Sequence, residues 1–165
     1  MKRWFAVHTH AHGEQRALLN LERQAFESWL PLYHRTRRHA GKVERVLRPL
    51  FSRYLFVALD LEAERWRAIL STYGVAGMVG LSDSPVPVPD AVIEALRDRA
   101  GDDGHFVVDA ARLKPGDPVR IEAGPMRDLE GVFEATSDDE RVIILLNLMG
   151  RGVRVTVPSD NIERA

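Results

Sequence analysis

Residues 49–57 read Pro49-Leu50-Phe51-Ser52-Arg53-Tyr54-Leu55-Phe56-Val57. The aromatic and β-branched content of this run predicts a strand from Phe51 to Leu59. The segment before it, from His34 to Arg53, holds seven Lys or Arg residues and one acidic residue, Glu44. An apolar strand next to such a cationic segment indicates a rigid sheet that carries a basic arm. Because such an arm attracts phosphates, it indicates a nucleic-acid partner.

The charge of the chain is divided unevenly along its length. The 165 residues carry a formal charge of −1, yet residues 1–57 hold eleven Lys or Arg against four Asp or Glu, and residues 58–165 hold twelve against twenty. A basic first third and an acidic remainder indicate two surfaces with different partners, or a basic surface that the acidic part of the same chain covers. Chance segregation of charge on one globule is the alternative.

The composition limits the class of protein. Apolar residues make up 45% of the chain, which is enough to bury a core. No cysteine is present, so disulfides and thiolate metal sites are excluded. No apolar stretch is long enough to span a membrane, and the short apolar segment after Arg3 is not a signal peptide. We therefore expect a soluble, cytoplasmic protein, by default a monomer, without a cofactor.

Hydrophobic periodicity predicts an α+β fold for the first hundred residues. Residues 35–48 lack this periodicity and contain Gly41, so we expect a long hairpin loop there. Short antiparallel links favour an α/β sandwich with an antiparallel sheet over a doubly wound sheet. The expected strands are Trp4–His8, Trp29–Tyr33, Phe51–Leu59 and Val75–Val79, and the expected helices are Glu14–Glu27, Glu62–Leu70 and a segment from Pro89 to near Gly101.

The last third of the chain has a different pattern. Residues 101–113 are polar and contain glycine, which is typical of a linker between a domain at 1–100 and a domain at 114–165. Short apolar runs then recur at roughly ten-residue spacing, which predicts a small β-barrel. The expected barrel strands include Val119–Ile121, Val132–Phe133, Val142–Leu146 and Val153–Val157.

Three glycine-containing segments lie within this last third. They read Lys114-Pro115-Gly116-Asp117-Pro118-Val119-Arg120-Ile121, Gly124-Pro125 and Gly131-Val132-Phe133. Glycine suits the turns and the strand bend that a small barrel requires. The pattern resembles the KOW motif of transcription and ribosomal proteins. Together with residues 49–57, it makes the whole chain resemble the NusG family of transcription elongation factors, in which an NGN domain precedes a five-stranded KOW β-barrel.

Within that family the chain is more similar to the RfaH-like specialised paralogues. The segments that carry this likeness are Leu21–Ala25, Pro49–Val57 and Leu145–Leu148. The resemblance implies a non-enzymatic elongation and antitermination factor that suppresses pausing and couples transcription to translation. Its implied partners are the clamp helices of the largest RNA polymerase subunit, the non-template DNA strand and, through the KOW domain, Rho or ribosomal protein S10.

The resemblance also implies two sets of binding residues. The polymerase-facing apolar patch would consist of Ala6, His8, Leu50, Phe51, Val79, Leu81 and Ile93. The contacts to non-template DNA would come from His10, Arg16, Thr72 and Tyr73. Arg16 suits a phosphate or a base edge. Tyr73 suits stacking on an unpaired base, an interaction of about 1–3 kcal/mol.

Two alternative functions rest on other features of the sequence. His8, His10 and His12 would share one face of a strand, a spacing that suits a metal and would serve a small metal-dependent hydrolase. No aspartate lies nearby to act as a base, and Gly13 is expected to end the strand. A ribosome- or RNA-binding module that uses only the barrel is the other alternative, although the barrel half is acidic.

RfaH itself raises the question of whether the last third can also be helical. There, the C-terminal domain forms a helical hairpin over the polymerase-binding patch and refolds into the barrel on activation. In this chain Gly131 would lie inside such a helix, at a cost of about 1 kcal/mol relative to Ala, and Arg48 occupies the position of an acidic interdomain partner. We therefore expect a persistent barrel on a flexible linker, because strands are preferred by Val142, Ile143, Ile144, Val153, Val155 and Val157.

Overall fold

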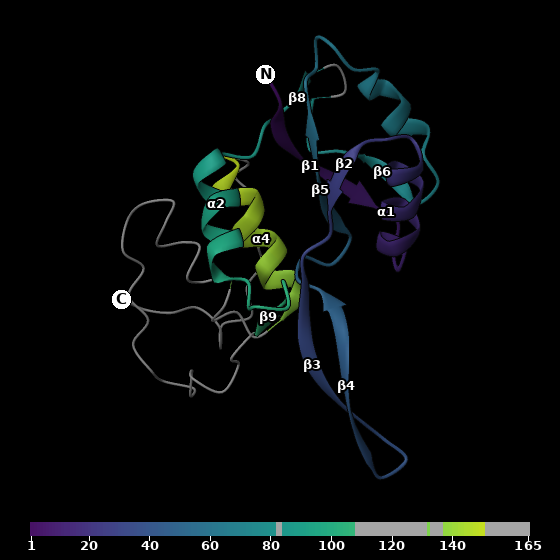
Figure 1. The fold of residues 1–165 in the computed structure, drawn as a ribbon, viewed down its shortest axis with the longest axis vertical. Coiled ribbons are helices and arrows are strands. Elements are labelled where there is room, and N and C mark those ends of the chain that lie inside the picture. Colours follow the sequence, from purple (N-terminus) through teal and green to yellow (C-terminus); the bar gives the residue numbers. More distant parts are fainter. Residues whose placement is uncertain (82–83, 108–131, 133–136, 151–165) are drawn as a thin grey trace.

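The computed structural model describes residues 1–81, 84–107, 132 and 137–150. A four-stranded antiparallel sheet of order β2–β5–β1–β6 forms its centre (Figure 1). The prediction of an α+β fold with an antiparallel sheet is thus confirmed for the first hundred residues. The strands of this sheet are β1 (Arg3–Thr9), β2 (Glu27–Trp29), β5 (Tyr54–Leu59) and β6 (Val75–Met78).

Side chains alternate between the two faces of the sheet along its central strands, and each face packs into its own hydrophobic core. Phe5 and Val7 of β1 pack with α1 (Glu14–Arg23) and the 3₁₀-helix η1 (Trp66–Ser71). Ala6, between them, belongs to the opposite cluster, which contains residues of α2 (Asp90–Arg99) and α4 (Asp138–Leu148). Successive side chains of a strand point to opposite faces, so the sheet is covered by helices on both sides.

The strand expected at Phe51–Leu59 begins only at Tyr54. Arg53 has a φ of 69°, and the Tyr54 amide donates to the Phe51 carbonyl at 3.0 Å, so a tight turn precedes the strand. The turn places Leu50 and Phe51 in the same core cluster. In a continuous strand, by contrast, two successive side chains would point to opposite faces.

The basic segment forms a two-stranded ribbon, not the expected loop. Strands β3 (Leu32–His39) and β4 (Lys42–Pro49) pair in register around a turn in which Ala40 and Gly41 both have positive φ. This turn geometry matches the twist of a hairpin, and cross-strand backbone hydrogen bonds need no apolar face. The ribbon projects from the body of the molecule (Figure 1).

Other element boundaries also differ from expectation. Helix α1 ends at Arg23 instead of Glu27, because Ala25 adopts a left-handed φ of 65° and Glu27 starts β2. The strand expected at Trp29–Tyr33 is split, and the Leu50 amide donates to the Pro31 carbonyl at 2.8 Å in the gap. Phe106, expected in the linker, belongs to β9 (Phe106–Val107), which pairs in parallel with β3. Strands β7 (Gly80–Leu81) and β8 (Ser84–Pro85) form a small separate pair.

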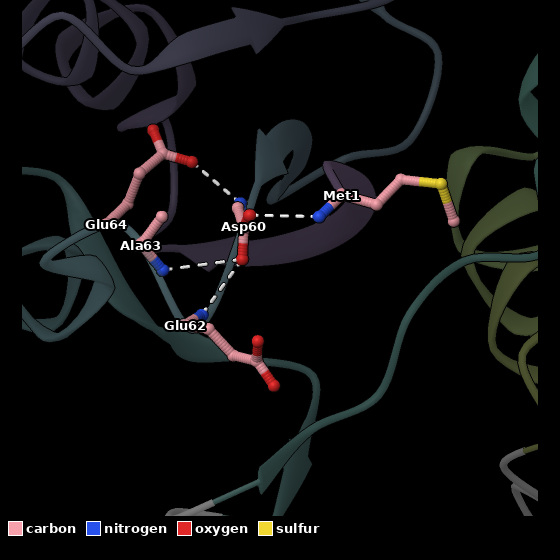
Figure 2. Close-up of polar contacts among 5 residues, drawn as sticks. All are labelled: Met1, Asp60, Glu62, Ala63 and Glu64. Carbon is pink, nitrogen blue, oxygen red and sulfur yellow. Dashed lines mark hydrogen bonds and ion pairs between the residues drawn. The ribbon is translucent and has the colours of Figure 1, made fainter.

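Asp60 organises the turn that follows β5 (Figure 2). Its carboxylate accepts hydrogen bonds from the amides of Glu62 at 3.0 Å and Ala63 at 3.4 Å, and from the Met1 amino group at 2.9 Å. The Asp60 amide in turn donates to the Glu64 carboxylate at 2.6 Å. These contacts make an aspartate-capped turn that redirects the chain toward η1.

Where the structure describes the last third of the chain, it contradicts the prediction of a persistent barrel. Val142–Leu146, expected to be a strand, lies within helix α4. Val132 has a helical conformation and is fully buried. Gly131, Val119–Ile121, Phe133 and Val153–Val157 lie outside the described residues. The helix forms because packing against the sheet domain outweighs the modest strand preference of its β-branched residues.

Candidate functional site

The predicted apolar patch comes together in the structure. Leu50, Phe51 and Ile93 are 0%, 1% and 3% exposed, and they share a cluster with the fully buried Ala6. Val79 is partly buried and packs against that cluster. The turn before β5, strand β1 and helix α2 each supply part of it. We call these five residues the apolar patch: Ala6, Leu50, Phe51, Val79 and Ile93.

The other two predicted patch residues are His8, on the inner strand β1, and Leu81, on β7. His8 on β1 stacks on Tyr54, with ring centroids 5.0 Å apart and planes inclined by 20°. Burial, followed by the charges of Arg53 and His10, lowers the pKa of His8. The neutral imidazole therefore acts here as a flat, half-buried ring. Leu81 lies in β7, and its side chain is outside the described residues.

Helix α4 covers the apolar patch. Its buried residues Leu145 and Leu148, with Met149 just beyond its end, belong to the same cluster as the patch. Figure 1 shows α4 lying alongside α2, on one face of the sheet. Leu145 is fully buried, so its contact with the patch excludes solvent. The patch is therefore occupied by the protein's own helix.

Polar contacts fix this helix at its first turn. The Tyr33 hydroxyl donates to Asp138 Oδ1 at 2.9 Å, and Arg141 Nε donates to the Leu50 carbonyl at 2.8 Å. Arg141 also pairs with Asp138, and its guanidinium lies 4.7 Å from the centre of the Tyr33 ring. Only 2% of Arg141 is exposed, and this burial lowers its pKa while Tyr33 opposes the shift. We call Tyr33, Asp138 and Arg141 the polar clamp.

Sequence reasoning missed α4 and the polar clamp, although the sequence carries signals for both helix ends. The Ser137 hydroxyl accepts the Glu140 amide at 3.2 Å, which is half of a capping box. Gly150 follows the helix with a φ of 75°, as expected of a residue just past a helix C-terminus. Arg48, expected to disfavour an interdomain contact, is exposed on β4 and leaves the contact to Tyr33 and the Leu50 carbonyl.

Three of the four predicted DNA contacts lie at one end of the sheet domain. His10 and Arg16 are exposed, and Tyr73 is 76% exposed. The His10 amide donates to the Gly74 carbonyl at 2.9 Å, which joins the turn after β1 to the loop after η1. A Cβ at Gly74 would lie 2.7 Å from the Ala17 nitrogen, so the loop packs directly on the backbone of α1. We call His10, Arg16 and Tyr73 the open end.

Thr72 is placed differently from its three neighbours. It is 7% exposed, its hydroxyl donates to the Ala68 carbonyl at 2.9 Å, and it accepts from Gln24 Nε2 at 2.9 Å. These bonds hold the loop that carries Tyr73 against α1. Buried Thr72 therefore holds in place the loop that carries Tyr73 of the open end.

The structure does not gather the histidines that suggested a metal site. His8 is in β1, His10 is in the following turn, and His12 has a left-handed φ of 60°. Within residues 1–81, 84–107, 132 and 137–150, the one group with three potential metal ligands is His34, Asp103 and His105. Hydrogen bonds from the His105 amide and from His34 lower the pKa of Asp103 to about 2.

The β3–β4 ribbon adds a cationic surface. Its charged side chains are exposed along both strands, and Glu44 is the single acid among them. An exposed row of cations attracts phosphates over a distance set by the salt concentration. The exposed cations of the ribbon are Arg35, Arg37, Arg38, Lys42, Arg45 and Arg48.

Comparison with known proteins identifies the class of the sheet domain. Residues 2–97 match the family model described as "Transcription termination factor nusG". Proteins named "Transcription termination/antitermination protein NusG" from Staphylococcus carnosus and Staphylococcus aureus are each 30% identical to this chain over 177 aligned residues. Each alignment covers 99% of this chain and 96% of the relative.

The chain therefore belongs to the NusG family of transcription termination and antitermination factors. A solved structure described as "Domain interaction in Thermotoga maritima NusG" is 23% identical, covers 75% of this chain and 67% of that chain, and has a TM-score of 0.46. Among the helices that the structure describes, none is long and apolar enough to cross a membrane.

Proposed function

We propose that the protein is a specialised, RfaH-like member of the NusG family that binds RNA polymerase during elongation, suppresses pausing and acts as an antitermination factor. The observation that supports this most directly is the placement of the apolar patch. Residues from three elements of the NusG-like domain converge there, and a helix from the last third of the chain covers them. Without α4 these residues would form an exposed apolar surface, and such surfaces on soluble proteins commonly mark binding sites.

The shape of the patch suits a helical partner. It is covered by α4, whose Leu145 and Leu148 belong to one cluster with residues of α2 and of the turn before β5. Grooves that receive the apolar face of one helix are a common mode of recognition. We infer that the clamp helices of the largest polymerase subunit bind the same surface, with Phe51 and Ile93 as central contacts.

This assignment makes α4 an intramolecular competitor of polymerase. A tethered helix acts at a high effective concentration, so the free protein is mostly closed. Binding to polymerase is weakened by the fraction of molecules that are open. The protein thus requires an opening step that a NusG protein with a separate C-terminal domain does not.

We further propose that residues 114–165 form the KOW barrel once α4 leaves the patch. Val142, Ile143 and Ile144 have low intrinsic helix preference, so α4 depends on its packing. A released segment rich in β-branched residues favours strands. In that state the barrel would bind Rho or ribosomal protein S10, the latter as the coupling to translation.

The open end would contact the non-template strand. Exposed Arg16 supplies charge, and Tyr73 supplies a ring on which an unpaired base stacks. The β3–β4 ribbon lies on the same domain and provides further cations for nearby nucleic acid. Thr72 contributes by holding the Tyr73 loop.

Binding of core RNA polymerase to four full-length proteins tests the proposal. The wild type should bind weakly, and Leu145→Asp should bind at least about tenfold more tightly, since a change of 1.4 kcal/mol in the opening equilibrium suffices. Asn147→Asp, on the exposed side of α4, is the matched control and should behave as the wild type. Adding Ile93→Asp to Leu145→Asp should abolish the gain; equal binding by all variants would refute the assigned surface.

A further inference from the structure

A cluster of two imidazoles and a carboxylate lies outside the apolar patch and the open end, at the base of the β3–β4 ribbon. His34 comes from β3, and Asp103 and His105 come from the segment between α2 and β9. His34 Nε2 is 2.7 Å from Asp103 Oδ2, and His105 Nδ1 is 3.4 Å from the same oxygen. One potential ligand atom of each residue lies within 4.8 Å of the others.

The backbone, and not only the mutual attraction of the side chains, brings the three residues together. Tyr33 pairs with Phe106, and His34 pairs with Val107, in the parallel β3–β9 ladder. The turn that carries Asp103 is closed by a hydrogen bond of 2.8 Å from the Gly101 amide to the His105 carbonyl. Because main-chain pairing fixes both segments, the ligand positions are largely preorganised.

We propose that His34, Asp103 and His105 form a binding site for a divalent transition-metal ion of the zinc class. Two imidazole nitrogens with one carboxylate oxygen suit zinc better than calcium or magnesium, which prefer oxygen ligands alone. Tetrahedral zinc with bonds of about 2.0–2.1 Å sets its ligand atoms about 3.3 Å apart. The observed separations of 2.7 Å and 3.4 Å approach that value, so small side-chain rotations admit the ion.

The surroundings leave room for a fourth ligand from solvent. The side chains of His34, Asp103 and His105 are 28%, 52% and 30% exposed. The ion would replace the direct hydrogen bond between His34 and Asp103 with two bonds to itself. A site with three protein ligands and an open position is common for zinc.

Metal binding at this place would clamp the segment after α2 to the ribbon. Tyr33 and Phe106 each adjoin a proposed ligand in the sequence, and both belong to the core cluster beneath α4. The ion would therefore stabilise the β3–β9 pairing, because a ligand that binds only the folded arrangement stabilises it. This site goes beyond the proposed function and does not depend on it.

Titration of the untagged, chelator-treated full-length protein with ZnCl₂ by calorimetry tests the site. We expect one ion per chain, and at least about tenfold weaker binding in His34→Ala and in His105→Ala, a loss typical of disturbed metal sites. Asp103→Asn should weaken binding as well. His8→Ala and His10→Ala serve as matched controls and should leave the affinity unchanged.

A second measurement guards against loss of folding in the variants. CoCl₂ added to the wild type should give the intense visible absorption of a tetrahedral nitrogen and oxygen site, and His34→Ala and His105→Ala should lack it while retaining wild-type circular dichroism. Absence of zinc binding by the wild type would overturn the proposal. So would binding that His34→Ala leaves intact or that His8→Ala removes.

Discussion

The apolar patch and the open end are two predicted binding surfaces of one small domain, and only one of them is covered. At the patch, Leu50, Phe51 and Ile93 are buried beneath α4. At the open end, His10 and Arg16 are exposed, and Tyr73 is 76% exposed. In this state the open end is accessible to solvent, whereas the apolar patch is not.

This difference follows from the chemistry of the two surfaces. An apolar patch left in water costs free energy roughly in proportion to its area, so an apolar helix from the same chain covers it. The open end is polar and solvated, and it gains nothing comparable from a cover. Regulation by the last third of the chain should therefore act on protein binding and leave contacts at the open end alone.

Replacing Leu145 with Asp should have the largest effect, because it should uncover the apolar patch. An unpaired carboxylate at this fully buried position is expected to cost more than the about 2–5 kcal/mol of a buried Leu→Ala change. The α4 helix should then leave the patch and lose its helical ¹³Cα shifts over residues 138–148. Asn147→Asp is the matched control and should keep those shifts; helical shifts retained in Leu145→Asp would contradict the role of packing.

Replacing Tyr73 with Ala should affect only the open end. Loss of a stacking interaction of about 1–3 kcal/mol weakens binding of a fluorescent single-stranded oligonucleotide by about 5- to 150-fold. Leu19→Ala, an exposed apolar position on α1, is the control. The same factor should appear when Tyr73→Ala is combined with Leu145→Asp. A factor that depends on α4 would show that the two surfaces are coupled.

Replacing Tyr33 with Phe should weaken the packing of α4 on the apolar patch without releasing the helix. The change deletes the hydrogen bond to Asp138 but keeps the ring beneath Arg141. A hydrogen bond of this kind contributes about 1 kcal/mol, so the open fraction should rise about fivefold. Hydrogen exchange of the Leu145 amide measures that fraction. Tyr54→Phe, which leaves the polar clamp intact, should give the wild-type rate.

The smallest expected effect concerns His8, beside the patch. Its pKa in the folded protein is lowered by burial and by the charges of Arg53 and His10, so the folded state disfavours its protonation. The stability that this neutral histidine contributes is present above the unfolded value of 6.5 and is lost as the pH falls below it. His8→Phe should therefore reduce the drop in melting temperature between pH 7.5 and pH 5.5. His39→Phe, at an exposed position, should reproduce the wild-type drop.

The sheet domain could be predicted from the sequence because its elements have clear periodicity. The alternation of Phe5, Ala6 and Val7 and the apolar stripe of α2 are local patterns that each element needs to bury its own face. The ribbon was missed because its strands project into solvent and carry no apolar face. Its Ala40-Gly41 turn was a weak signal.

The helix α4, which covers the apolar patch, could not be predicted in the same way. Val142, Ile143 and Ile144 favour a strand, while Ser137, Glu140 and Gly150 mark the two ends of a helix. Local preferences of similar size thus point in opposite directions, and packing of Leu145 on residues some 50–140 positions earlier decides between them. Such distant contacts are not visible in one sequence. The patch residues themselves came from the resemblance to the family.

In the proposed mechanism, α4 and the polymerase clamp helices occupy the same surface of the sheet domain in turn. The most direct test records ¹³Cα shifts of residues 138–148 in the labelled full-length protein, alone and with a saturating clamp-helix fragment. We predict helical shifts in the free protein and their loss on binding, together with shift changes at Phe51 and Ile93. Strand-like shifts in the free protein, or helical shifts that persist while the fragment binds the patch, would contradict competition between α4 and the clamp helices.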